Sequence, residues 1–510
     1  MAPFSRRAFL KNTAWATAGV VTFPYLAKNW YALAATDAPG YFAREFGITD
    51  EVCRKTLAEA LSRGGDFAEL YFEHTVRNWL VLEDGQVNQA YSQVELGVGI
   101  RTVKGDQIGY GYTQQLAEAP MLAAAAIAAT IASGSASKTS DAFTRLGEGN
   151  AYPLDRLLTE VPLESKIPLV QGLNDQCFAR SSLVSKVTAQ FHDEQRRVMI
   201  VTSDGTVVED LQPKSYLAAT VLAEKDGRRE RAGWNLGGRR SFSFYSPAVV
   251  TEIVEKAVDR TLTLFDAVQP PAGEMPVVLG PGITGILLHE AIGHGMEADF
   301  NRKGVSTYAT MIGRKVAEPA VTIIDDGTIP QLNGSLNFDD EGTPTKKTVL
   351  VDRGILTSYM HDKISARHYG VEPTGNGRRE SFQHYIQPRM RNTYMLAGDA
   401  SPEDVIREAG NGIYVQDVSN GQVKIGEGDF AFYVSQGRLI ENGKLSSPIK
   451  DINIMGNGPK MLANVMVVGN DLQMSQGGTG FCGKGGQRVA VGFGQPTVLV
   501  KSMTVGGVKT

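Results

Sequence analysis

Hydrophobic and polar positions alternate along two separate stretches of the N-terminal half, residues 67–112 and 187–234. Turn sequences interrupt each stretch twice: Asp84-Gly85 and Lys104-Gly105-Asp106 in the first, Asp204-Gly205 and Lys225-Asp226-Gly227 in the second. Alternation indicates strands with one buried face, and a glycine-containing turn between two such runs predicts a hairpin. Each turn of the second stretch follows the corresponding turn of the first by nearly the same number of residues, which indicates two related units.

A helix-like stretch follows each hairpin pattern. Residues 116–131 are rich in alanine, whereas residues 247–265 begin with Ser246 at the N-cap and Pro247 at the first helical position. A polar stretch from Ser133 to about Pro162 connects the two hairpin-plus-helix units. This pattern is compatible with pairing of the two units in one sheet but does not require such pairing.

The pattern changes after Pro270-Pro271-Ala272-Gly273, a sequence that marks a domain boundary. From Met275 onward glycine and β-branched residues dominate. Short strands are predicted at residues 320–324, 347–351, 413–418, 463–468 and 497–500. One apolar helix, Ile283 to His294, stands out among them. These features predict a strand-rich, mostly antiparallel C-terminal domain with long loops.

The predicted fold class is therefore α+β, with an N-terminal α/β region followed by the strand-rich domain. The 510 residues of the chain exceed what one hydrophobic core usually supports. We divide the chain into an N-terminal segment at 1–35, α+β domains at 36–163 and 164–270, and the strand-rich domain at 271–510. A formal net charge of -4 gives no basic field, so nucleic acid is not an expected partner.

The first 35 residues resemble a twin-arginine export signal. Paired Arg6 and Arg7 precede a weakly apolar run, and Ala32-Leu33-Ala34 is suited to cleavage. The alternative is a cytosolic N-terminal helix in which the arginines occur by chance. Export predicts a periplasmic or otherwise exported protein. No later apolar stretch approaches the ~20 residues that span a bilayer, so no membrane span is expected after signal removal.

Three cysteines, Cys53, Cys177 and Cys482, are too few for a disulfide framework in a chain of this length. In an oxidising compartment Cys53 and Cys177 could pair. Alternatively, both are buried small apolar groups, because free cysteine is among the most buried residue types. Cys482 differs from them, since it lies in the glycine-rich segment 477–487 beside Lys484. Backbone N–H groups and this lysine would favour its thiolate.

The apolar helix ends in a candidate metal-binding pattern, His289-Glu290 followed by His294. On a regular helix an i+5 residue lies about 140° round from the first, so the two imidazoles could not share one ion. Gly293 and Gly295 permit a π-bulge or a helix end that would swing His294 back. The spacing therefore predicts that the helix ends or bulges at Gly293. Otherwise, His289 is a hydrogen-bonded core residue.

Two imidazoles and one anionic ligand would hold Zn²⁺ with one position open for water. His289, His294 and Cys482 are the candidate ligands, and Glu290 is the candidate general base because it adjoins a ligand. The alternative catalytic hypothesis makes Cys482 a nucleophile with His289 as its base and no metal.

Several motifs resemble those of the metallopeptidase family that includes bacterial TldD and its partner PmbA (TldE). They include HEAIGHGMEADFNRKG, DDGT, DDEGTPT, PTGNGRRESF, RMRNTYM, GGQV, MVVGNDL and GFCGKGGQ, in this order along the chain. The resemblance runs from about His289 to the C-terminus, with weaker similarity back to about Val52.

The resemblance implies a zinc-dependent protease acting on small or unfolded peptides. It implies that His289, His294 and Cys482 ligate zinc and that Glu290 is the catalytic glutamate. Family members form dimers, so a homodimer or a heterodimer with a PmbA/TldE-type subunit is expected. Because the chain keeps all four residues, it resembles the catalytic TldD type; the alternative is a non-catalytic peptide-binding partner. The family is chiefly cytosolic, from which the export signal departs.

Peptide binding is expected to add a strand to a sheet edge, because main-chain pairing makes no demand on sequence. Arg378, Arg379 and Arg391 are candidates to hold a peptide carboxylate. Salt links that bridge the domains are an equal alternative for them.

Overall fold

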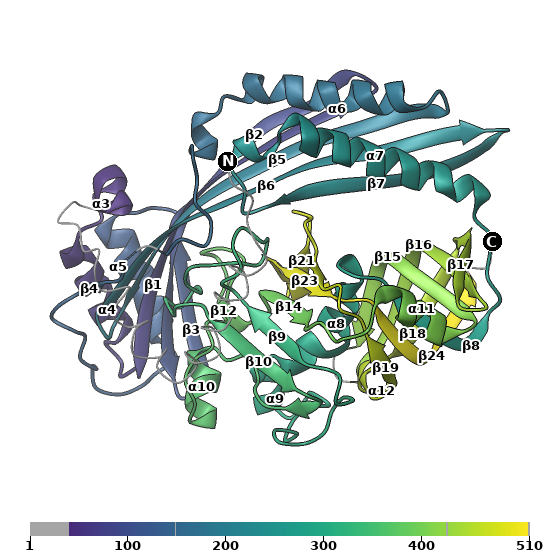
Figure 1. Cartoon of the computed structure of the whole chain (residues 1–510). Coiled ribbons are helices and arrows are strands. Elements are labelled where there is room, and N and C mark those ends of the chain that lie inside the picture. Colours follow the sequence, from purple (N-terminus) through teal and green to yellow (C-terminus); the bar gives the residue numbers. More distant parts are fainter. Residues whose placement is uncertain (1–39, 148, 425–426, 508–510) are drawn as a thin grey trace, which may run out of the picture.

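The computed structural model describes residues 40–147, 149–424 and 427–507. A long, mostly antiparallel sheet from the N-terminal half arches over the C-terminal domain, and α6 (Ile167–Arg180) and α7 (Pro247–Thr263) lie over the top of the arch (Figure 1). The twin-arginine signal predicted at residues 1–35 lies outside the described residues. No described helix combines the length and the apolar composition needed to cross a membrane.

The arched sheet contains both predicted hairpin units. Its strands are β1 (Phe67–Glu83), β2 (Gln86–Lys104), β3 (Gln107–Thr113), β4 (Thr144–Arg145), β5 (Val184–Thr202), β6 (Thr206–Lys225) and β7 (Arg228–Gly238). All four predicted turns join consecutive strands, and Asp84-Gly85 has positive φ at both residues, as a two-residue hairpin turn requires. β1 pairs with β5 from Glu69 opposite Thr202 to Glu83 opposite Thr188. This pairing joins the two units in one sheet.

In each unit one helix precedes the three strands along the chain and another follows them. The helices are α4 (Asp50–Ala60) and α5 (Glu118–Ala129) in the first unit, and α6 (Ile167–Arg180) and α7 (Pro247–Thr263) in the second. A shorter helix, α3 (Tyr41–Phe46), precedes them. The predictions for α5 and α7 are confirmed, although the Ser246 side chain makes no capping hydrogen bond. The sequence reading omitted α4 and α6. Cys53 in α4 and Cys177 in α6 are both free and buried.

The C-terminal domain contains two larger sheets and two strand pairs. One sheet runs β11-β10-β9-β14-β23-β20 and the other β15-β8-β24-β18-β16-β17, with β19 on β24. Their strands are β8 (Gly273–Leu279), β9 (Ile323–Asp326), β10 (Lys347–Asp352), β11 (Ile355–Leu356), β14 (Asn392–Met395), β15 (Gly412–Lys424), β16 (Asp429–Glu441), β17 (Lys444–Ile449), β18 (Ile452–Asn457), β19 (Val465–Val468), β20 (Gln473–Met474), β23 (Gly492–Gln495) and β24 (Val498–Gly507). The strand pairs are β12 (Gly377–Arg378) with β13 (Gln387–Pro388), and β21 (Phe481–Lys484) with β22 (Gln487–Ala490).

Most pairings in this domain are antiparallel, as predicted; β14 with β23 and β15 with β8 are parallel. All five predicted strands overlap observed ones, but Ala463 ends a helix instead of beginning β19. The helices are α8 (Ile286–Leu288), α9 (Ala298–Arg302), α10 (Lys363–Tyr369), α11 (Pro402–Ala409) and α12 (Gly458–Ala463). The apolar segment predicted as one helix from Ile283 to His294 is broken into turns of different pitch.

Buried ion pairs fasten the C-terminal domain to the inner face of the sheet. The Arg101 guanidinium on β2 lies 2.7 Å from a Glu69 carboxylate oxygen and 2.5 Å from one of Glu341. Arg379 also pairs with Glu69. All four side chains are fully buried. For Arg379 the structure therefore matches the domain-bridging alternative.

The other two arginines bond to groups within the C-terminal domain. Arg391 pairs with Asp325 at 3.0 Å, and Arg378 donates to the Met390 carbonyl oxygen at 2.7 Å. Because the Arg391 guanidinium is fully buried against Asp325, it is not placed to receive a peptide carboxylate.

Replacing Arg101 tests the domain contact. Arg101→Met should reduce the free energy of unfolding by about 3–5 kcal/mol, because it leaves Glu341 Oε1 buried without its cation. Lys104→Met is the matched control on the same strand: its pair with Asp66 is partly exposed, so the loss should stay below about 1 kcal/mol. Urea unfolding followed by circular dichroism measures both. Equal losses in the two variants would contradict the assignment.

Candidate metal centre

His289 begins a π-helical turn, His289–Gly293, which follows α8, and His294 caps the end of this turn and begins a 3-10 turn at His294–Met296. The His294 N–H donates to the His289 carbonyl oxygen, a bond that spans five residues. The two imidazole centroids lie 5.3 Å apart with the rings at 82°. The predicted bulge is therefore present, and it brings both rings to the same side.

The glycines on this turn are required for a different reason from the one predicted. Gly293 has φ of -57°, a helical value open to any residue. A Cβ there would lie 2.1 Å from Met390 Sδ, and a Cβ on Gly295 would lie 2.6 Å from the Tyr308 ring. Close packing of the neighbouring segments, and not backbone freedom, therefore requires glycine at these two positions.

The third candidate ligand, Cys482, lies on the β21–β22 hairpin. The segment interpreted as a glycine-rich loop is a pair of strands in which Cys482 lies opposite Val489. Gly485 and Gly486 have φ of 56° and 77°, so they supply the left-handed conformation of its two-residue turn. Cys482 Sγ lies 3.2 Å from His294 Nε2.

Together, His289, His294 and Cys482 form a buried cluster. One ligand atom from each lies within 4.8 Å of the other two. His289 Nδ1 is buried and has no hydrogen-bond partner among the described residues. Two imidazoles and one thiolate suit a borderline-soft transition metal. The donor set and its spacing therefore fit a metal ion.

The imidazoles also determine the charge of the thiol. Burial alone would raise the pKa of Cys482, but His294 and His289 beside it lower that pKa well below its ordinary value. The expected contribution of Lys484 is indirect, because its ammonium group lies 3.1 Å from Glu297 and 2.7 Å from Asp299. The favoured thiolate is the protonation state that metal binding needs.

Glu297 contacts the His294 ring on the side away from Cys482. Its carboxylate lies 3.0 Å from His294 Nδ1, which leaves Nε2 of that ring directed at Cys482. Burial would raise the pKa of Glu297, but Lys484 and His294 lower it to about 2. A carboxylate on the second imidazole nitrogen fixes the ring and increases its basicity as a ligand. No role was assigned to Glu297 from the sequence; its spacing of three from His294 was the available signal.

Glu290 differs from Glu297 because its side chain is 19% exposed, whereas that of Glu297 is fully buried. One of its carboxylate oxygens lies 3.7 Å from His294 Nε2. It is thus beside the cluster and open to solvent, the position expected of a proton carrier.

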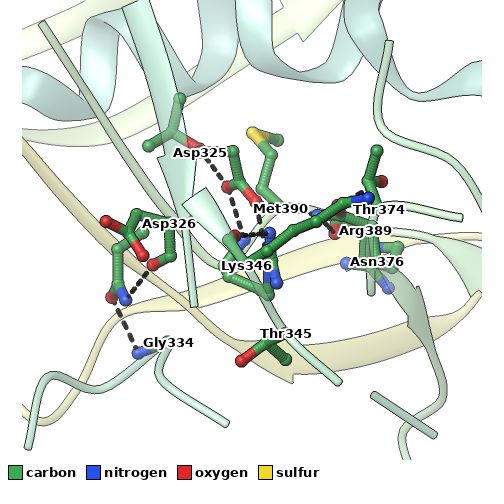
Figure 2. A network of polar contacts seen from close by, with 12 residues as sticks. Asp325, Asp326, Gly334, Thr345, Lys346, Thr374, Asn376, Arg389 and Met390 are labelled. Atoms are coloured by element: carbon green, nitrogen blue, oxygen red, sulfur yellow. Dashed lines mark hydrogen bonds and ion pairs between the residues drawn. The ribbon is translucent and has the colours of Figure 1, made fainter. Parts of the chain in front are cut away.

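A second polar network holds the segment behind the cluster. Asp325 accepts hydrogen bonds from the Arg391 N–H at 2.8 Å and from Asn376 Nδ2 at 2.8 Å (Figure 2). These bonds fix residues 389–391, so that Met390 packs against Gly293 and Arg389 donates to the Cys482 carbonyl oxygen at 2.5 Å. Within RMRNTYM only Arg391 was singled out from the sequence; the density of polar residues next to a strand was the missed signal.

Three family models match the chain: PmbA/TldA metallopeptidase domain 1 at residues 68–133, the central domain at 156–265 and the C-terminal domain at 272–507. These matches identify the class as metallopeptidase, with which the α+β fold and the buried cluster of metal-ligand side chains agree.

The chain is 40% identical over 452 residues to the "Metalloprotease TldD homolog" of Haemophilus influenzae, covering 87% of this chain and 94% of the relative. It is 37% identical over 471 residues to the protein of the same name from Buchnera aphidicola, covering 90% and 96%. The chain therefore belongs to the PmbA/TldD metallopeptidase family.

Solved structures share the fold. TldE from Thermococcus kodakarensis superposes with a TM-score of 0.68 at 20% identity, covering 87% of this chain and 97% of that chain. A Thermotoga maritima protein described as a putative modulator of a DNA gyrase gives 0.70 at 24% identity, covering 86% and 96%. At these identities the likeness extends to the fold alone.

Replacing Glu297 tests its support of His294. Glu297→Gln should weaken metal affinity about 10–100-fold, because a neutral amide holds the imidazole less firmly and reduces its basicity. Competition with a chromophoric chelator measures the affinity. Asp299→Asn is the matched control, since Asp299 shares Lys484 with Glu297 but has no recorded bond to His294. An unchanged affinity in Glu297→Gln, with the control also unchanged, would remove Glu297 from this role.

Proposed function

We propose that this chain is a zinc-dependent peptidase, the catalytic TldD-type subunit of its family. The supporting observation is the convergence of His289, His294 and Cys482 within 4.8 Å, with Glu290 on the same turn. Two imidazoles and a thiolate are a donor set of catalytic zinc sites, which keep a further position open.

Zinc bound there would supply Lewis acidity that activates water and polarises a peptide carbonyl. The residues of the chain provide the rest. Glu290 accepts the proton of the attacking water and returns it to the leaving amine, since its carboxylate reaches solvent beside the cluster. Glu297 holds a proton at His294 Nδ1 and keeps Nε2 free as a ligand.

The proposed substrates are small or unfolded peptides, bound as an added strand. Main-chain pairing suits such substrates because it recognises no particular side chains. The proposed active form is a homodimer or a heterodimer with a PmbA/TldE-type subunit. Membership of the PmbA/TldD family supports a partner of that type.

A cysteine hydrolase without metal is the second candidate. The distance of 3.2 Å between Cys482 Sγ and His294 Nε2 suits a thiolate–imidazolium pair, although the sequence suggested His289 as the base. Cys482 is only 2% exposed, however, which restricts the approach of a peptide carbonyl to its sulfur.

Metal content and one substitution separate the candidates. Purified protein should contain about one zinc per chain and lose peptide cleavage on chelation, with recovery on adding zinc. Glu290→Gln should retain the zinc and lower kcat about 10²–10⁴-fold, because the proton carrier is lost. Elemental analysis and fluorogenic peptide hydrolysis measure these quantities.

Other outcomes identify the alternatives. Cleavage that survives chelation but is lost on thiol alkylation would establish the cysteine hydrolase. Peptide binding without cleavage, by metal-loaded protein tested alone and with a TldE-type subunit, would establish a binding partner. Wild-type cleavage by Glu290→Gln would exclude Glu290 as the base.

Export by the twin-arginine route is also part of the proposal. Replacing Arg6 and Arg7 together by lysine should retain the protein in the cytoplasm, because the route reads the arginine pair. Immunoblots of periplasmic and cytoplasmic fractions measure the distribution. Substituting Lys11 by arginine is the control and should leave export intact. Periplasmic accumulation of the double variant would contradict this assignment.

A further inference from the structure

A second site of concentrated charge lies outside the metal cluster. A cavity of about 410 Å³ separates the inner face of the arched sheet from the C-terminal domain. Strands β1, β2, β5 and β6 form one wall, and the β21–β22 hairpin contributes to the other. Phe481 and Arg488 line the cavity, and alternation along β21 directs Phe481 to the face opposite Cys482. The cavity is thus on the reverse side of the hairpin from the metal ligands.

The lining is rich in cations. Seven lysine or arginine side chains line the cavity, against four carboxylates. The carboxylates have partners: Glu194 pairs with Arg77 at 2.5 Å, and Asp340 accepts the Arg379 N–H at 2.8 Å. The excess charge is therefore positive.

Four of these cations have no ion pair among the described residues. Arg488 is exposed, whereas Lys214, Arg239 and Arg378 are buried. Lys214 makes no recorded hydrogen bond, and its ammonium group lies 3.4 Å from the Phe481 ring centroid. Arg239 and Arg378 each donate to one carbonyl oxygen, while their Nε atoms are buried without a partner. A buried charge without a counter-ion is costly, which favours an anion brought in from outside.

The titration of Lys214 agrees with this environment. Burial and the neighbouring arginines, which outweigh Glu194, lower the pKa of Lys214 to about 7. Burial similarly lowers the pKa of Arg378 to about 9. A negative ligand would relieve this repulsion between like charges.

We infer that this cavity is a binding site for an oxyanion, a carboxylate or phosphate group carried by a small ligand or a peptide terminus. Guanidinium groups match the geometry of both anions, and a lysine adds a point charge. The volume lies within the range of small-ligand sites, so it accommodates more than a free inorganic ion. The site is separate from the proposed cleavage centre and requires no peptidase activity.

Calorimetric titration of the full-length protein tests the inference at fixed low ionic strength. The probes are inorganic phosphate, a short peptide with a free C-terminal carboxylate and the same peptide as its C-terminal amide. We expect wild-type protein to bind phosphate or the peptide acid. If the natural ligand is a peptide C-terminus, the amide should bind at least about tenfold more weakly than the acid. Preference for phosphate over the peptide acid identifies a phosphate-bearing ligand.

Two cavity variants and one control complete the test. Lys214→Met and Arg488→Gln should each weaken binding of the preferred anion about tenfold or more, because each removes a cation from one wall. Arg488 is exposed, so its replacement tests the site even if the Lys214 variant is unstable. Lys225→Met, exposed at the end of the same strand as Lys214, should bind as wild type. Absence of binding to every probe, or wild-type affinity in both cavity variants, would overturn the inference.

Discussion

The candidate metal centre depends on one buried carboxylate, that of Glu297. It contacts His294 at the end of the π-helical turn, Lys484 from the β21–β22 hairpin and, at 3.7 Å, Arg389 from the segment before β14. A buried ion must be matched by partners with good geometry, because desolvation costs several kcal/mol per charge. These partners come from three separate parts of the C-terminal domain. Satisfying Glu297 therefore requires all three to be in place, and two of them also deliver the metal ligands.

Two further buried charge contacts, farther from the cluster, also need well-placed partners. Asp325 fixes the segment of Arg389 and Met390, and that segment packs against Gly293 on the turn between the histidines. Further out, Arg101 and Glu69 on the arched sheet pair with Glu341 and Arg379 of the C-terminal domain. Because interiors are close-packed, displacement at one of these contacts is transmitted to the next. The sheet thus supports the metal-bearing domain and encloses the basic cavity with it.

Local chemistry explains which predictions succeeded. The hairpins follow from turn sequences such as Asp84-Gly85, whose preferred backbone needs no distant partner. The three candidate ligands were chosen from residue types and spacing, and the fold brings them close together, while the five-residue interval matched a π-turn. Helix α4 was missed although Thr49 caps it by accepting the Val52 N–H, a signal that was present in the sequence. Helix α6 carries weaker local signals, and its packing between α7 and β5 defines it.

The sequence by itself therefore determined the hairpin units, the candidate ligands and the need for an irregular helix, since these depend on neighbouring residues. Only the tertiary structure decided that Gly293 is required by Met390, that Lys484 acts through Glu297, and that Arg379 joins two domains. The physical reason is that each of these contacts joins residues far apart in the chain. Their energies depend on burial and on the partners that folding brings within reach, which a linear pattern of residues does not record.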